Sequence, residues 1–232
     1  ISLRSEMMNA NLSGDVALQQ LPGALKKHLG NYFDLQKKHT LNTIKPQKFD
    51  FEINVTDPTL LTEGIIPELE KLTPFSAKGK YDSEAKNITL DMELAQVIYS
   101  KIVIDSFKLN INSDPQTLNC ELKIAEVSNP TLKMENIFLA SQLHDNYIHF
   151  QLNTAKDDST KMLAVSGNLK SIHETFNLKL EPALLLNNLN FTVDSSNYLV
   201  FGKAGIIANN LILNHEKQKI AINSTEKEGQ PP

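Results

Sequence analysis

Apolar and polar residues alternate along most of this chain. Between residues 118 and 124 the even positions are apolar and the odd positions are polar or charged. The same alternation returns at 148–152 and at 176–180, with no helical stripe of apolar residues between them. A period of two is typical of a strand with one apolar face and one hydrated face. This part of the chain is therefore predicted to form consecutive strands joined by polar turns.

Further strands are predicted on both sides of this segment. The alternating runs lie at 49–55, 88–94, 102–111, 132–139 and 162–169. In the run 102–111 the apolar positions change from even to odd numbers, which predicts a change of register near Asp105. Glycines are few and the turns are polar, so we expect loops longer than tight two-residue hairpins. The pattern predicts a long antiparallel sheet with one apolar face.

Two short helices are predicted in the N-terminal third. Leu21, Leu25, Leu29 and Phe33 recur at intervals of four, which predicts a helix over 22–34. Asp57-Pro58 is a helix-start signal before the apolar positions of a second helix over 58–72. Pro67 is expected to break or restart that helix near Ile66. We interpret the second helix as a plug over one end of the sheet, with partner docking as the alternative.

The composition adds limits to this picture. At 232 residues the chain is predicted to be one β-rich domain over 1–224, followed by a polar tail over 225–232, and we expect it to be a fragment of a larger protein. Aromatic residues make up 6% and Trp is absent, so the apolar face consists of Leu, Ile and Val with a few Phe. A net charge of −4 gives no reason to expect a nucleic-acid partner.

The single cysteine excludes an intrachain disulfide framework. Cys120 falls on the apolar side of its strand, so a buried thiol is expected. No apolar run approaches the roughly 20 residues of a spanning helix. The basic stretch 35–48 is interpreted as a solvated connection, with contact to anionic headgroups as the alternative.

No catalytic motif is present. The sequence contains no nucleophile elbow, phosphate loop, dinucleotide fingerprint or zinc-protease helix. Only His144 and His149 lie close together, and we expect opposite parity for them within one strand, which argues against a metal site. We therefore predict a protein that is not an enzyme and needs no cofactor. A hydrolase with an atypical site is the least favoured alternative.

A pattern near both termini carries a family resemblance. The C-terminal run contains a Leu- and Asn-rich step, strands that open with an aromatic residue, an Asn-containing turn and a final Gln-hydrophobic strand. These steps are Leu184–Asn188, Phe191–Val193, Asn197, Leu199–Phe201, Ile206–Leu213 and Gln218–Ile222. Near the N-terminus, Asn-Leu-Ser-Gly at 11–14 precedes the helix that ends at Tyr32-Phe33. Together they resemble the TamB and AsmA-like envelope proteins, especially those of Bacteroidetes, although the family often has Trp where this chain has Phe191.

The resemblance implies a fold, a place and a role. The fold is mainly β, a long antiparallel sheet curled into an open U-shaped groove, the β-taco. Such proteins are anchored in the inner membrane by an N-terminal helix and extend across the bacterial periplasm. They act in outer-membrane biogenesis, with phospholipid transport as the favoured activity. TamB pairs with an outer-membrane assembly barrel of the TamA type, the other half of the translocation and assembly module.

The resemblance and the alternation together give a candidate site, a groove that binds phospholipid acyl chains. Its predicted lining is the apolar side of the clearest strands: Phe49, Phe51, Ile53, Ile88, Leu90, Met92, Leu118, Leu122, Ile124, Ile148, Phe150, Leu152, Phe191 and Val193. The alternative is a structural or adhesive β-domain in which the same residues fill a closed core. Such a domain would act as a spacer or docking module.

Overall fold

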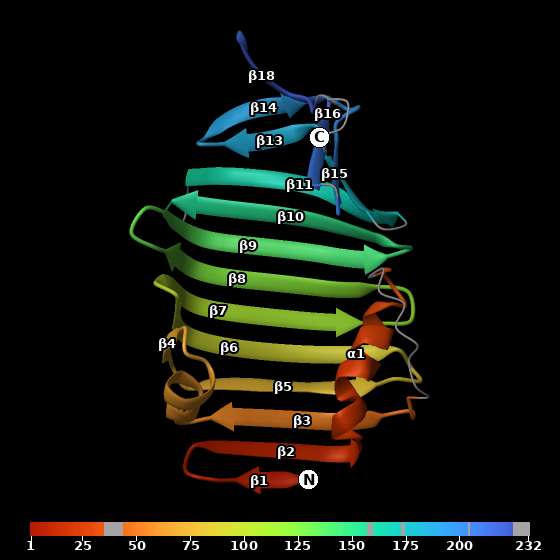
Figure 1. The fold of residues 1–232 in the computed structure, drawn as a ribbon, viewed down its shortest axis with the longest axis vertical. Coiled ribbons are helices and arrows are strands. Elements are labelled where there is room, and N and C mark those ends of the chain that lie inside the picture. Colours follow the sequence, from red (N-terminus) through yellow and green to blue (C-terminus); the bar gives the residue numbers. More distant parts are fainter. Residues whose placement is uncertain (35–43, 157–159, 173–174, 204, 225–232) are drawn as a thin grey trace.

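One long antiparallel sheet dominates the molecule (Figure 1). The computed structural model describes residues 1–34, 44–156, 160–172, 175–203 and 205–224. Within these residues eighteen strands belong to a single sheet that does not close into a barrel. The prediction of a mainly β chain with a long, open antiparallel sheet is confirmed.

The strands become long in the middle of the chain, where the sequence alternates most regularly. The first half contains β1 (Ser2–Arg4), β2 (Met8–Asp15), β3 (Lys48–Val55), β4 (Leu69–Leu72), β5 (Phe75–Asp82), β6 (Asn87–Tyr99), β7 (Ile102–Ser113) and β8 (Leu118–Ser128). The second half contains β9 (Lys133–His144), β10 (Tyr147–Lys156), β11 (Thr160–Ile172), β12 (Thr175–Leu180), β13 (Ala183–Leu186), β14 (Leu189–Val193), β15 (Tyr198–Gly202), β16 (Gly205–Asn209), β17 (Leu211–His215) and β18 (Gln218–Ile222).

Sequential strands lie next to each other through most of the sheet. From β5 to β11 each strand pairs with the next, and β3 pairs with β5. β4 pairs with the second half of β6, beyond the part that β5 occupies. After β11 the sheet divides, because β12 continues to β15 and β16 while β13 continues to β14, β17 and β18. The two branches are visible at the blue end of Figure 1.

The register gathers the apolar positions into four parallel rows on one face, which we call the apolar face. Residues paired across antiparallel strands point to the same side of a sheet. The helix row contains Phe49, Tyr81, Ile88, Leu118, Leu143, Ile148 and Leu169. The second row contains Phe51, Gly79, Leu90, Ile111, Cys120, Ser141, Phe150 and Gly167. The third row contains Ile53, Ala77, Met92, Leu109, Leu122, Leu139, Leu152 and Val165.

The fourth row, the crease row, contains Val55, Phe75, Leu94, Phe107, Ile124 and Ile137. Beside it the ladder is interrupted at one level in β6, β7, β8 and β9. The pairings between these strands omit Ala95, Ser106, Ala125 and Asn136, and we call these four residues the crease line. Ser106 and Asn136 have φ of 53° and 46°, the left-handed region, which turns the direction of a strand.

The crease line explains the change of parity in the sequence. Leu94 and Val97 are three residues apart, a spacing that puts two side chains on opposite faces of a regular strand. Because the ladder breaks between them, the alternation restarts on the far side of the line. The register change predicted near Asp105 is therefore wrong as a change of pairing, because β6 and β7 keep one register on both sides of Ser106, but the apolar positions do change parity there.

Helix α1 (Leu21–Leu29) lies against the apolar face near the ends of the strands (Figure 1). It follows a 3₁₀ turn, η1 (Leu18–Gln20), and Pro22 occupies its first turn. Ala24 packs with Phe49 and Tyr81 in a buried hydrophobic cluster, and the Tyr81 hydroxyl donates a 3.1 Å hydrogen bond to the carbonyl oxygen of Ala24. The helix predicted over 22–34 is therefore present but ends at Leu29.

The chain after α1 continues along the rim of the sheet. The Tyr32 hydroxyl donates to the carbonyl oxygens of Lys86 and Asp114, at 2.9 and 2.7 Å. Phe33 stacks on Phe176 of β12 with ring centroids 6.0 Å apart. The segment 21–34 thus contacts the same ends of the strands along the sheet, from the β5–β6 turn to β12.

The prediction of a second helix over 58–72 is wrong for about half of that range. Only η2 (Leu60–Ile65), one wide π-helical turn, is helical, and Leu69–Leu72 is strand β4. The backbone is already extended at Ile66, just before Pro67. Leu72 pairs with Val97 in β6, so sheet pairing overrides the local helical spacing. The end of the basic stretch enters β3 at Lys48, whereas its residues 35–43 and the predicted tail 225–232 lie outside the described part of the chain.

Asn197 holds the C-terminal branches together. Its side chain is 1% exposed. Its Nδ2 donates to the carbonyl oxygens of Leu180 and Asp194, at 3.0 and 2.7 Å, and its Oδ1 accepts from the Leu180 N–H at 2.9 Å. The Asn-containing turn that the sequence pattern singles out is thus a buried link between β12 and the turn before β15.

Candidate functional site

The register brings twelve of the fourteen predicted lining residues onto the apolar face. Those in β3, β6, β8 and β10 occupy the four rows in sequence order. Phe49, Ile88, Leu118 and Ile148 lie in the helix row, Phe51, Leu90 and Phe150 in the second row, Ile53, Met92, Leu122 and Leu152 in the third, and Ile124 in the crease row. Residues more than 100 positions apart in sequence thus form one continuous surface.

The deepest burial on this surface is at some positions of its two outer rows, whereas Ile148 of the helix row and Phe107 of the crease row are half-buried. In the helix row, Phe49 and Leu118 are 5% and 4% exposed. In the crease row, Leu94 and Ile124 are both 8% exposed, although the described elements outside the sheet are only η1, α1 and η2. Both residues lie next to the crease line, where the strand ladder is interrupted.

The second and third rows between them form what we call the groove floor. Its Leu, Ile, Met and Phe side chains are half-buried in β3, β6, β7, β8, β9 and β10. A closed core would bury such side chains almost completely. In the described structure the groove floor is therefore an open apolar surface.

Two glycines shape the floor. Phe51 faces Gly79 across the β3–β5 pair, and Phe150 faces Gly167 across the β10–β11 pair. A Cβ atom at Gly79 would overlap the carbonyl oxygen of Thr89 and lie 2.7 Å from Cζ of Phe51. The rings thus occupy the space that a side chain at either glycine would need, a cross-strand arrangement known to stabilise glycine in strands.

Phe191 and Val193 lie apart from the floor, in the C-terminal branch. They are 7% and 4% exposed. The Phe191 ring contacts the His215 ring with centroids 5.2 Å apart, and Val193 pairs with Leu213. These two predicted lining residues belong to a small local core.

Cys120 lies in the second row, paired with Ile111 and Ser141. The expectation of a buried thiol holds only in part, because the side chain is half-buried. Burial nevertheless raises the pKa of the thiol, and the nearby Ser141 hydroxyl opposes that shift. Cys120 is therefore a weakly reactive thiol on the apolar face.

The face of the sheet opposite the apolar face is polar and carries several pairs of opposite charges. Lys48 lies 2.9 Å from Asp82, and Lys108 Nζ lies 3.1 Å from Glu93 Oε1. Hydrogen bonds to the Ala85 N–H and to Lys48 lower the pKa of Asp82. The Lys48, Lys108 and Glu93 side chains are well exposed, so such pairs add little stability but keep this face hydrated.

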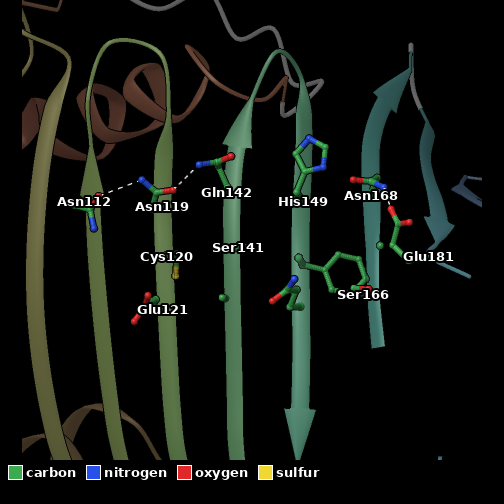
Figure 2. A pocket seen from close by; sticks show the side chains of 14 residues that line it. Asn112, Asn119, Cys120, Glu121, Ser141, Gln142, His149, Ser166, Asn168 and Glu181 are labelled. Carbon is green, nitrogen blue, oxygen red and sulfur yellow. Dashed lines mark hydrogen bonds between the residues drawn. The ribbon is translucent and has the colours of Figure 1, made fainter. Parts of the chain in front are cut away.

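A cavity of about 570 Å³ lies on the polar face, over β7 to β12 (Figure 2). We call it the polar cavity. It is lined by amide, carboxylate, hydroxyl and imidazole groups: Asn112, Asn119, Glu121, Gln142, His149, Gln151, Ser166, Asn168 and Glu181, with Cys120, Ala140, Ser141, Phe150 and Gly167 at its base. The sequence did not predict it, since its residues look like ordinary solvent positions until their strands are aligned.

The two neighbouring histidines are closer than the sequence suggested. His144 ends β9 and His149 lies in β10, so a turn separates them and the opposite-parity interpretation is wrong. Their rings stack with centroids 4.7 Å apart. Throughout the described residues, no group of three or more His, Cys, Asp or Glu side chains is arranged to hold a metal ion.

No family model, curated protein or solved structure matches this chain. Among the described residues, no helix is both long and apolar enough to cross a bilayer.

Proposed function

We propose that this chain is a groove segment of a TamB-like envelope protein, and that the groove floor binds and conducts phospholipid acyl chains between the inner and outer membranes. The proposal places the chain in the bacterial periplasm, within a full-length protein anchored in the inner membrane. A TamA-type outer-membrane barrel is the proposed protein partner. The observation that carries the proposal is the open groove floor from β3 to β11, in which the third row is apolar at every strand and the second row is interrupted only by Ser141 and two glycines.

The dimensions of the floor suit an acyl chain. Strands in a sheet lie about 4.8 Å apart, so the seven steps from β3 to β11 span about 34 Å. Two leaflets of acyl chains together occupy about 30 Å in a bilayer. A fully extended acyl chain therefore fits along either row.

Apolar contact alone provides the affinity. Each CH₂ group that leaves water contributes about 0.8 kcal/mol, and no directional group is needed. Leu122 pairs with Leu109 and Leu139 in the third row, so its direct partners on both sides are apolar. A chain can slide along such a row because each position resembles the next, which is what conduction requires.

The test introduces a charge at the centre of the floor. Purified protein is titrated with cis-parinaric acid, a fluorescent fatty acid, and the extracted protein is analysed for bound phospholipid by mass spectrometry. We expect saturable uptake and co-purified phospholipid, and we expect Leu122→Asp to weaken uptake at least about tenfold because a carboxylate in the row must be desolvated.

Lys123→Asp is the matched control, because it places the same carboxylate one residue away on the polar face. It should leave uptake unchanged. The absence of saturable uptake by the wild-type protein would favour a spacer or docking domain with a closed core. In cells, Leu122→Arg in the parent gene should impair the envelope barrier, and an intact barrier would argue against the transport role.

A further inference from the structure

We propose that the polar cavity is a binding site for a neutral oligosaccharide, laid across the strands on the face opposite the groove floor. The site is independent of the acyl-chain proposal, because its polar side chains point away from the apolar face. Figure 2 shows its lining residues projecting from neighbouring strands.

A row of amides forms the long side of the cavity. The register aligns Asn112, Asn119, Gln142, His149 and Asn168 across five consecutive strands. Gln142 Nε2 donates to Asn119 Oδ1 at 3.0 Å, and Asn119 Nδ2 donates to Asn112 Oδ1 at 3.2 Å. These bonds fix the orientation of the amides in advance. Each amide has two N–H groups and a carbonyl with two lone pairs, so capacity remains for a ligand.

Small residues make the hollow. The next row on the polar face runs from Glu121 through Ala140 and Gln151 to Ser166. Ala140 lies between two longer side chains, and Ser166 lies next to Gly167. The short side chains leave room above the backbone, while Glu121 and Gln151 stand at the sides. The hollow thus follows from the order of large and small residues along this row.

The charge of the cavity selects against anionic ligands. Its lining contains two carboxylates, Glu121 and Glu181, and no Lys or Arg among the described residues that form it. Asn168 Nδ2 donates to Glu181 Oε1 at 2.7 Å, which holds that carboxylate at the edge of the cavity. Phosphate or nucleic-acid ligands would be repelled, whereas carboxylate oxygens accept hydrogen bonds from hydroxyl groups.

An aromatic step borders the amide row. The His149 ring stacks on His144, at 4.7 Å and an interplanar angle of 20°, and on Tyr147, at 5.8 Å and 23°. Lys170 Nζ lies 4.7 Å from the centroid of the Tyr147 ring. A flat ring beside planar amides and carboxylates is suited to a sugar, because one face of a pyranose presents C–H groups and its rim presents hydroxyl groups.

The spacing of the polar groups favours a chain of sugars over a single one. One planar side chain, an amide or the His149 imidazole, recurs in each strand of the row, about every 4.8 Å. One sugar unit of an extended glycan has a similar length. An oligosaccharide that crosses the strands would therefore meet one planar side chain for each unit, from Asn112 to Asn168. An extended peptide is the competing ligand, but the side chains that project into the cavity are mostly amides, carboxylates and hydroxyl groups, which suit hydroxyl groups better than apolar side chains.

The experiment uses three neutral hexasaccharides, cellohexaose, chitohexaose and maltohexaose, titrated into the purified protein by calorimetry. At least one is expected to bind saturably at millimolar concentration or below. Gln142→Ala and His149→Ala should each weaken binding about fivefold, the effect of losing one neutral hydrogen bond or one ring contact. Asn54→Ala, which removes a half-buried amide from the same face outside the cavity, should change nothing.

Three outcomes would overturn the proposal. One is the absence of binding by all three sugars, and another is wild-type affinity in both cavity variants. The third is binding of a neutral Gly-Ser hexapeptide where no hexasaccharide binds, which would identify a peptide groove. Thermal midpoints show that the variants fold, and Leu122→Asp, which acts on the other face, should retain sugar binding and so separates this site from the acyl-chain site.

Discussion

The His28 imidazole and the Ser113 hydroxyl join α1 to the sheet, with Nε2 3.0 Å from Oγ. His28 is 3% exposed and Ser113 is 5% exposed. The His28 ring also makes T-shaped contacts with the rings of Tyr32 and Tyr81, at centroid distances of 5.4 and 5.5 Å. Nothing in the sequence distinguishes this histidine from the others, yet it lies at the centre of the contact between α1 and the sheet.

This contact makes the stability of the protein depend on pH. Burial lowers the pKa of His28, because the cation would lose its hydration. The unfolded chain therefore binds more protons than the folded one as the pH falls below about 6.5, and the free energy of unfolding decreases. We expect the thermal midpoint to fall between pH 7 and pH 5.

His28→Gln should reduce that dependence, as measured by thermal unfolding at the two pH values. The groups that face His28 are Ser113, Tyr32 and Tyr81, none of which titrates in this range. Carboxylates with a lowered pKa, such as Asp82 and Asp114, lose their contribution only as the pH falls below about 4. An equally steep pH dependence in the variant would contradict the assignment to His28.

Gly79 is predicted to tolerate no side chain. In Gly79→Ala the new methyl group would overlap the Thr89 carbonyl oxygen and the Phe51 ring, so the strands must shift. We expect a loss of about 1–3 kcal/mol in the free energy of unfolding, measured by denaturant titration. Gly30→Ala is the control, because Gly30 has an ordinary φ of −62° and a Cβ there would make only ordinary contacts at 3.4 Å. Equal stability of the two variants would mean that the packing of Phe51 on Gly79 is unimportant.

The crease line is predicted to depend on backbone freedom at Ser106. Its φ of 53° is unfavourable for a β-branched residue. Ser106→Val should therefore cost about 1–2 kcal/mol, whereas Ser106→Gly should be neutral or stabilising. Ser76→Val, in the regular part of β5, should be harmless or favourable, because Val suits an exposed strand position. If Ser106→Val were as stable as the wild-type protein in denaturant titration, the left-handed turn would not be needed for the crease.

Local patterns predicted the elements that depend on near neighbours. The alternation from Leu118 to Ile124 defines a strand and its apolar side without reference to the rest of the chain, and β8 has both. The change of the apolar positions from even to odd numbers near Asp105 indicated where the strand ladder is interrupted, at Ser106. Leu69 and Leu72 fitted a helical spacing, but a strand formed there because β6 offered an unpaired edge beyond β5.

The sequence by itself therefore determined the strands, their apolar side and the place of the crease, since a period of two is a property of adjacent residues. Only the tertiary structure decided which rows stay open. Burial of Phe49 and Tyr81 in the helix row depends on where α1 lies, because Ala24 of that helix packs with them. The polar cavity likewise exists only because register aligns Asn119, Gln142 and His149, which are separated by 23 and 7 residues and carry no local signal of one another.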